Sequence, residues 1–348
     1  MYKILSCDGG GIRGLLTAIL LESLEAELQQ LDPNATIANC FDMFAGTSTG
    51  SIIACGLAKG MTAKKIRQFY EQEGEKIFPT MDANFWRKEA LERIRKGDVS
   101  LPLFQAKSLE AVLTSAEVFP PSLLFGKLPK PTLITSYDTY NREAVVFKST
   151  QDKFATIPVW QVCRSSSAAP VAFAGYLMQD EQFLQALKED APNFEGDLPT
   201  KIPPEGIPLI DGGVVANNPA LCAIAEQIAA EGNRGLNDIL VAAFGTGQLP
   251  RRITPNEAIT WGGLDWVDLF NGIPLLDVFS DGSADAIDYV SGKLLRDNYL
   301  RYQPVLEPET STFQADSKNL KLLRKAAENY LNTGGRKRFQ KLAQKLLS

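Results

Sequence analysis

The chain has 348 residues, of which 45% are hydrophobic and 22% charged, and its formal net charge is −5. This balance is typical of a globular protein with a large core, and the negative charge argues against a generally basic nucleic-acid surface, so no nucleic-acid partner is expected. The chain contains no histidine, which excludes a Ser-His-Asp triad, a Cys-His pair and the usual histidine-containing zinc site.

The first 60 residues predict two successive units of strand, glycine turn and helix. Residues 2–7 are short and apolar, as in a buried strand, and apolar residues recur at helical spacing over 15–31. The sequence "LDPN" at 31–34 ends this helix because proline cannot continue it. "CFDMFAG" at 40–46 predicts a second strand and "SIIACGLAKG" at 51–60 a second helix. This order favours an α/β fold with a parallel sheet.

Residues 62–130 predict a mainly helical segment. "AKKIRQFYEQEGEKIF" at 63–78 and "FWRKEALERIRKG" at 85–97 are charged and amphipathic. "KSLEAVLTSAEVF" at 107–119 predicts a third helix, with Ser108 as its candidate N-cap. We expect this segment to border a substrate cleft.

The remainder of the chain alternates again between strands and helices. Strand character returns at 131–139 and 143–149, and residues 211–248 add a turn, a helix and a strand. Residues 180–207 are polar and contain several prolines, which predicts a surface insertion.

The last 31 residues, 318–348, hold nine basic side chains and one acidic one, with apolar residues on one helical face. This pattern predicts a C-terminal helix docked on the body of the protein. Its basic face is either simply solvated or attracts anionic lipid headgroups.

The sequence also carries signals about location. It contains no run of 18 apolar residues that would predict a membrane span, and its N-terminus lacks the basic and apolar regions of a secretory signal. Five scattered cysteines in mostly apolar or small-residue surroundings are typical of buried free thiols in a reducing compartment. We therefore expect a cytoplasmic protein.

A glycine-rich loop follows the first strand. The sequence "LSCDGGGIRG" at 5–14 fits G-x-G-x-x-G, the dinucleotide-binding fingerprint. That fold also needs an acidic residue at the end of the second strand to hold the ribose, and this strand ends instead in "FAGTSTG". NAD binding is therefore disfavoured. A P-loop is excluded because no G-K-[ST] follows the glycines.

The "GTSTG" stretch at 46–50 is a G-x-S-x-G motif between a predicted strand and a predicted helix, the setting of a nucleophile elbow. Its alternative is a glycine-rich turn with a capping serine. Without histidine, a base for Ser48 must be a carboxylate or a lysine. Asp211 ends a strand-like run before two glycines, at the sheet edge where α/β ligands gather, although Asp-Gly-Gly also makes ordinary turns. Asp8 is a rival base, and its alternative role is to brace the loop.

The glycine loop can serve acyl transfer. Successive glycines can direct backbone N–H groups into one concavity beside a helix N-terminus, where they stabilise a developing oxyanion. Gly9, Gly10 and Gly11 could supply these donors without side chains in the way. Arg13 adds positive charge nearby or, alternatively, forms a surface or fold-bracing salt bridge.

Together these motifs resemble the patatin-like phospholipase family, lipid acyl hydrolases with a Ser–Asp dyad. The matching blocks stand in the family's order over residues 4 to 248, whereas 62–130 and the chain after 250 match loosely. The blocks are "DGGGIRG" at 8–14, "GTSTG" at 46–50, "RSSSAAPVAF" at 164–173, "DGG" at 211–213 followed by "NNP", and "FGTGQ" at 244–248.

The resemblance implies a three-layer α/β/α fold with a central, largely parallel sheet. It assigns Ser48 as the nucleophile, Asp211 as the base, and the loop with Gly9, Gly10, Gly11 and Arg13 as the oxyanion hole, with neither a metal nor another cofactor. It further implies one acyl hydrolase domain over 1–310, with the basic helical segment 311–348 docked on it.

The implied reaction is hydrolysis of a fatty-acyl ester of a phospholipid or galactolipid through an acyl-enzyme, at a peripheral membrane surface. The alternatives are an acyltransferase using the same dyad and a lipid-binding member whose dyad is unused. Aromatic residues of 62–130 either line an acyl cleft or pack in the core. They are Phe69, Tyr70, Phe78, Phe85, Trp86 and Phe104.

Overall fold

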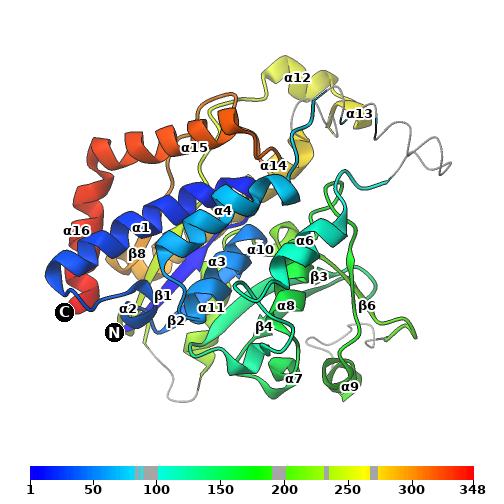
Figure 1. The fold of residues 1–348 in the computed structure, drawn as a ribbon, viewed down its shortest axis with the longest axis horizontal. Coiled ribbons are helices and arrows are strands. Elements are labelled where there is room, and N and C mark those ends of the chain that lie inside the picture. The colour runs from blue at the N-terminus through cyan, green and yellow to red at the C-terminus, as the bar shows by residue number, and fades with distance from the viewer. Residues whose placement is uncertain (83–84, 86–87, 89–100, 190–200, 231–234, 267–272) are drawn as a thin grey trace.

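The structure, a computed structural model, describes residues 1–82, 85, 88, 101–189, 201–230, 235–266 and 273–348. Within these ranges it contains one eight-stranded sheet with the strand order β5-β6-β3-β2-β1-β7-β8, and β4 pairs with β3 (Figure 1). The strands are β1 (Tyr2–Cys7), β2 (Met43–Thr47), β3 (Thr132–Asp138), β4 (Glu143–Lys148), β5 (Tyr176–Met178), β6 (Ile207–Asp211), β7 (Ile239–Phe244) and β8 (Tyr299–Tyr302).

The sheet is largely parallel. The central strands β3, β2, β1, β7 and β8 pair in parallel, whereas β4 and β6 each run antiparallel to β3, and β5 runs antiparallel to β6. The carboxyl ends of the central strands therefore meet at one edge of the sheet, where loops that carry ligand sites gather.

Both faces of the sheet are covered, because its central strands are apolar on both sides. Every residue of β7 is buried, and its side chains alternate between two separate clusters of core residues. Helices of one layer contribute to the larger cluster: α1 (Gly14–Leu31), α3 (Thr49–Ala58), α4 (Ala63–Ile77), α6 (Ala106–Leu113), α8 (Val159–Ser166), α15 (Ser317–Tyr330) and α16 (Arg336–Leu347).

The opposite layer contains α11 (Ala220–Ala229) and α14 (Pro274–Leu295), which pack on the smaller cluster. The prediction of a three-layer α/β/α fold with a largely parallel sheet is thereby confirmed. The shorter helices are α2 (Ile37–Cys40), α7 (Asp152–Ala155), α9 (Glu181–Glu189), α10 (Gly213–Ala216), α12 (Pro255–Thr260) and α13 (Gly263–Trp266).

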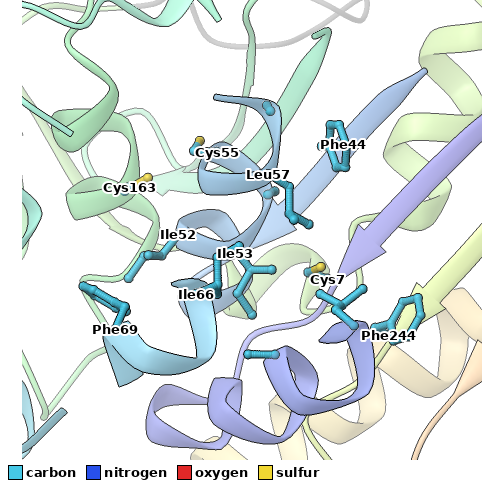
Figure 2. Packing of buried hydrophobic residues seen from close by; sticks show 14 of the residues in the cluster. Cys7, Phe44, Ile52, Ile53, Cys55, Leu57, Ile66, Phe69, Cys163 and Phe244 are labelled. Atoms are coloured by element: carbon cyan, nitrogen blue, oxygen red, sulfur yellow. The ribbon is translucent and has the colours of Figure 1, made fainter. Parts of the chain in front are cut away.

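Helix α3 lies at the centre of the larger cluster. Figure 2 shows Ile53 of this helix pointing toward Ile66 of α4, and Cys55 beside Cys163 of α8.

All five cysteines are free, and four of them are buried, as their apolar surroundings predict. None of the helices in the described ranges has the length and apolarity needed to span a membrane.

Several predicted boundaries change. The predicted helix at 107–119 begins at Ala106 and ends at Leu113, and its N-cap is Gln105, so the assignment of Ser108 as N-cap is wrong. Ser108 is the third residue of this helix and therefore lies inside its first turn. The predicted helix at 85–97 lies outside the described residues except for residues 85 and 88.

The predicted surface insertion at 180–207 is partly helical. Helix α9 buries Phe183 against the rings of Phe147 and Phe154, so this part of the segment adds to the core. Residues 190–200 of the segment lie outside the described residues.

The C-terminal helices α15 and α16 meet at a kink, where Gly334 has a φ of 119°. Helix α16 packs on α1, and its Phe339 ring lies against the rings of Phe244 and Tyr302. Five of the nine basic side chains of 318–348 bond to the body or to a neighbouring helix: Arg324, Lys325, Arg336, Arg338 and Lys345.

Candidate active site

Ser48 lies at the tip of a sharp turn between β2 and α3. Its φ of 53° and ψ of −125° are values that residues other than glycine rarely adopt. A Cβ on Gly46 would lie 2.2 Å from the carbonyl oxygen of Gly50, and a Cβ on Gly50 would lie 2.1 Å from that of Cys7. Both glycines of G-x-S-x-G are therefore required by close backbone packing, which gives the turn the geometry of a nucleophile elbow.

Asp211 is the last residue of β6, and the structure brings its side chain to Ser48. The Ser48 hydroxyl lies near enough to the Asp211 carboxylate to lower its pKa, and both residues line the same cavity. The backbone N–H of Gly213 donates a hydrogen bond to Asp211 Oδ1 at 2.7 Å. The carboxylate is thus held by the two-glycine turn that follows it, and it faces the hydroxyl.

Burial governs the protonation of Asp211, which is 5% exposed. Removal from water raises its pKa from 3.8 to about 6, and the hydrogen bonds from Ser48 and Gly213 oppose that rise. At neutral pH the side chain is therefore mostly ionised. It is also a stronger base than an exposed aspartate, which suits proton transfer near pH 7.

The backbone amides of the glycine loop have different partners. The N–H of Gly9, one of the predicted oxyanion donors, donates to the carbonyl oxygen of Asn217 at 3.1 Å and so is not free in this structure. The N–H groups of Gly10 and Gly11 have no acceptor in the described part of the chain, and both residues line the same cavity as Ser48. The loop therefore offers two free donors.

Neighbouring carbonyl groups fix the direction of these donors. The Gly9 carbonyl accepts a hydrogen bond from Thr246 Oγ1 at 2.8 Å, and the Gly10 carbonyl accepts one from the Arg13 N–H at 3.0 Å. In a trans peptide the C=O and the following N–H point in opposite directions. The bond from Thr246 therefore points the Gly10 N–H away from Thr246. In the same way, the bond from the Arg13 N–H points the Gly11 N–H away from Arg13 N.

Gly10 and Gly11 cannot be replaced without strain. Their φ values of 155° and 55° are ones that side-chain-bearing residues rarely adopt. A Cβ would lie 2.2 Å from Thr246 Oγ1 at Gly10, and 2.3 Å from the Thr312 carbonyl oxygen at Gly11.

Asp8, the rival base, is tied to the sheet. Both of its carboxylate oxygens accept hydrogen bonds from the guanidinium of Arg301 on β8, at 3.0 and 2.5 Å. Burial raises the pKa of Asp8 to about 6, and the Arg301 charge opposes that rise. Asp8 is absent from the lining of the Ser48 cavity, so of its two predicted roles the structure supports the bracing one.

Arg13 faces the cavity and is 5% exposed. Its Nε donates a hydrogen bond to the Gly10 carbonyl at 3.4 Å. The alternative prediction of a salt bridge is not met, because Arg13 forms no ion pair with any residue that the structure describes.

A cavity open to solvent lies above Ser48 and Asp211. Of the aromatic residues proposed for an acyl cleft, Phe69, Tyr70 and Phe78 line it, Phe104 packs in the core beside it, and Trp86 lies outside the described residues. Its apolar wall is completed by Ile52, Ile77, Leu109, Ala169, Pro170, Phe173 and Phe313. Such a cavity suits a hydrocarbon chain.

Three contributors to the site escape sequence reasoning. Ser166 Oγ accepts a hydrogen bond from the Ser48 N–H at 2.8 Å, Asn217 binds the Gly9 N–H through its carbonyl, and Thr246 holds the Gly9 carbonyl. Each lies in a block that the family resemblance quotes ("RSSSAAP", "NNP", "FGTGQ"), and that is the only signal that could have singled them out.

The chain is similar in sequence to known proteins over most of its length. A family model described as "Patatin-like phospholipase" matches residues 5–224. Patatin-like protein 2 of Arabidopsis thaliana is 31% identical over 95% of this chain and 83% of its own length, and Patatin-like protein 1 of the same plant is 30% identical over 95% and 81%. A solved structure of human GIVD cytosolic phospholipase A2 in complex with methyl gamma-linolenyl fluorophosphonate is similar over 100% of this chain and 60% of that chain, with 14% identity and a TM-score of 0.43.

Proposed function

The chain belongs to the patatin-like phospholipase family, and on that premise we propose that it cleaves fatty-acyl esters of phospholipids or galactolipids through a Ser48–Asp211 dyad. Family membership supports a lipid hydrolase. The dyad, the acyl-enzyme and the kind of ester are our proposal. The observation that carries it is that Ser48, at the tip of a strained turn, and the buried Asp211 line one cavity with an apolar wall.

In the first step, Ser48 Oγ attacks the ester carbonyl carbon while Asp211 accepts the hydroxyl proton. The negative charge that develops on the carbonyl oxygen is stabilised by the N–H groups of Gly10 and Gly11. Each such donor contributes about 3 kcal/mol to lowering a barrier of this kind. Collapse of the tetrahedral intermediate breaks the ester C–O bond, and the leaving alcohol takes the proton from Asp211.

In the second step, water hydrolyses the acyl-enzyme. Asp211 accepts a proton from the water as its oxygen attacks the acyl carbon, and it returns the proton to Ser48 Oγ when the fatty acid leaves. One side chain thus serves as base and acid in turn, which the absence of histidine demands.

The test is hydrolysis of 4-nitrophenyl butyrate and of a long-chain phospholipid by variants of the dyad. Ser48→Ala and Asp211→Asn should each lower kcat by about 10³-fold or more, because the residues act as a unit. Release of free fatty acid in the presence of a lysolipid acceptor separates hydrolysis from acyl transfer.

Two matched variants control for folding. Ser165→Ala removes a buried hydroxyl that bonds to Gln161 within its own helix, and Asp138→Asn neutralises a buried carboxylate in the β3–β4 turn. Both should retain wild-type kcat. Wild-type hydrolysis by either dyad variant would refute the proposal.

A further inference from the structure

The cavity has a polar end that the acyl-transfer steps do not use. Besides its apolar wall, the cavity is lined by Arg13 beyond the glycine loop, by Asp277 and Ser280 of α14, and by Thr312. A lipid ester bound at Ser48 carries its acyl chain on one side of the carbonyl and its headgroup on the other. The polar end is therefore where a headgroup would lie once the chain occupies the apolar part.

Arg13 is a buried cation that lacks a counter-ion. It is 95% buried, its one side-chain hydrogen bond runs from Nε to the Gly10 carbonyl, and its terminal nitrogens have no partner among the described residues. A guanidinium that is mostly removed from water and has no counter-ion is costly, whereas an anion bound beside it gains a charge-assisted hydrogen bond. The side chain that is best placed to bind an anionic group is thus aimed into the cavity.

One carboxylate, that of Asp277, lines the cavity, and a second, that of Asp281, lies just outside its lining. Asp277 and Asp281 lie one turn apart on α14, and the charge of Arg13 lowers the pKa of both. Burial outweighs that effect and raises the pKa of Asp277 to about 6, so this side chain is mostly ionised at neutral pH. Neither carboxylate forms an ion pair with Arg13 or with any other described residue.

Other charged groups near this end do not neutralise it. The charge of Arg251 lowers the pKa of Asp277, and the charge of Asp285 raises the pKa of Asp281. Asp8 also feels the charge of Arg13, but it is already paired with Arg301. One cation, Arg13, and one carboxylate, Asp277, therefore line the cavity beside the dyad without pairing with each other, and Asp281 lies one turn away.

We propose that Arg13 and Asp277, with Asp281 one turn further along α14 at its rim, form a headgroup subsite that selects zwitterionic phospholipids, those with a phosphate and an ammonium group. The phosphate pairs with Arg13 and the ammonium with the carboxylates of α14. An anionic headgroup would meet the two carboxylates, and an uncharged sugar headgroup would leave Arg13 without a counter-ion. The subsite rests on the proposed function, since it assumes that the scissile ester lies at Ser48.

The test uses soluble substrates, so that the charge of a lipid surface does not enter. Dihexanoyl phosphatidylcholine and dihexanoyl phosphatidylglycerol, both kept below their micelle-forming concentrations, are compared by kcat/KM. Wild type should prefer the choline lipid by about tenfold, and Asp277→Asn should lower that preference about five- to tenfold, as expected for loss of one partly desolvated charge pair. Asp281→Asn should shift it in the same direction but less, because Asp281 is exposed.

Asp285→Asn is the matched control. It removes an exposed carboxylate from the same helix that does not line the cavity, and it should leave the choline-to-glycerol ratio unchanged. Asp277 also lies in the first turn of α14, where a carboxylate stabilises a helix. A purely structural role would change the melting temperature and both lipid activities alike, but not their ratio.

Two results would overturn the subsite in an enzyme that still hydrolyses 4-nitrophenyl butyrate. One is equal wild-type kcat/KM on the two lipids, and the other is an unchanged choline-to-glycerol ratio in Asp277→Asn. Arg13→Gln gives an independent measurement, because it should reduce activity on both phospholipids relative to a short-chain galactolipid. If wild type cleaves none of these esters, the proposed function itself fails, and the subsite fails with it.

Discussion

At the scale of single residues, the site depends on two unfavourable arrangements held in place by their neighbours. Ser48 keeps a positive φ because Gly46 and Gly50 pack directly on backbone atoms and Ser166 binds its N–H. Asp211 keeps a buried negative charge with two hydrogen bonds. Both arrangements cost free energy of folding, as is common at catalytic centres.

The first prediction concerns the stability of Asp211→Asn. An asparagine can still accept from the Gly213 N–H and can donate to Ser48 Oγ, while it removes the buried charge. Between pH 4 and 6 folded Asp211 holds a proton that the unfolded chain has released, so wild-type stability falls as pH rises through this window. The variant should match wild type near pH 4 and exceed it above pH 6 by about 3 kcal/mol at most, at about 1.36 kcal/mol per pKa unit.

Urea unfolding at pH 4.5 and pH 7.5 measures the effect. Asp138→Asn, which removes another buried carboxylate at the end of a strand, serves as the comparison. A variant less stable than wild type at pH 7.5 would contradict the account of the Asp211 charge.

The second prediction concerns Thr246, which acts on the reaction by positioning. Its hydroxyl holds the Gly9 carbonyl and so directs the Gly10 N–H. Thr246→Val keeps the shape and removes this bond, and kcat should fall about tenfold, less than the loss from deleting an oxyanion donor outright. Thr17→Val removes a comparable buried bond, to the Gly245 carbonyl at 3.0 Å, and should leave kcat unchanged. Equal kcat values in the two variants would show that the Gly9 carbonyl bond is irrelevant to catalysis.

At the scale of elements, β8 secures the glycine loop although 293 residues separate Asp8 from Arg301. Arg301 pairs with Asp8 after β1 and also lies 2.9 Å from Asp288 of α14. Through one guanidinium, a strand at the edge of the sheet connects the loop to the opposite helical layer.

The third prediction tests this connection. Arg301→Met leaves Asp8 buried without its cation, and it should cost about 3–5 kcal/mol at pH 7.5. The loss should shrink toward pH 5, because Asp8, whose pKa burial already raises to about 6, can then take up a proton. The double variant with Asp8→Asn should recover most of the stability in thermal or urea unfolding. Additive losses in the double variant would mean that the two side chains are not coupled.

The sequence predicts these elements unevenly. The strands β1, β3, β4 and β7 and helices α1, α3 and α4 carry clear apolar periodicity, and the structure places them within a few residues of the expected bounds. Strands β5 and β8 are too short and too mixed in composition to be recognised, and the antiparallel direction of β6 depends on tertiary pairing. Long-range partners such as Arg301 leave no local signal.

The candidate site divides in the same way. Ser48, Asp211, Gly10 and Gly11 stand in motifs whose chemistry indicates a role, and the structure gathers all four around one cavity. Gly9 sits in the same motif, but its N–H is used by Asn217, which no spacing rule reveals. Asp277 belongs to a helix that no motif marks.

At the scale of the whole molecule, the C-terminal helix completes the larger core. Phe339, Leu342 and Leu346 of α16 are buried, and the Lys3 ammonium of β1 donates to the Leu346 carbonyl. Lys3 and Leu346 lie at the start of the parallel strands, whereas Ser48 lies at their carboxyl ends. Among the basic residues of 318–348, Lys318, Lys321, Lys337 and Lys341 have no bonding partner in the described ranges, and Arg338 and Lys345 bond only to uncharged groups.

The fourth prediction separates this support from catalysis. Phe339→Ala should lower the free energy of unfolding by about 3–5 kcal/mol, as is typical for removing a fully buried aromatic ring. Leu347→Ala, at a half-exposed position of the same helix, should cost far less. Below its melting temperature Phe339→Ala should keep wild-type kcat on a soluble ester. A large loss of kcat in the folded variant would show that α16 reaches the site.

The account rests most on Ser48 as the nucleophile, and a long-chain fluorophosphonate tests this directly. Peptide mapping by mass spectrometry after incubation should find one adduct per chain, on Ser48, with ester hydrolysis lost in proportion to labelling. Labelling should be at least about 10²-fold slower in Asp211→Asn, because the base that activates the hydroxyl is gone. An enzyme that cleaves lipid esters while Ser48 stays unmodified, or that is inactivated through another residue, would contradict the account.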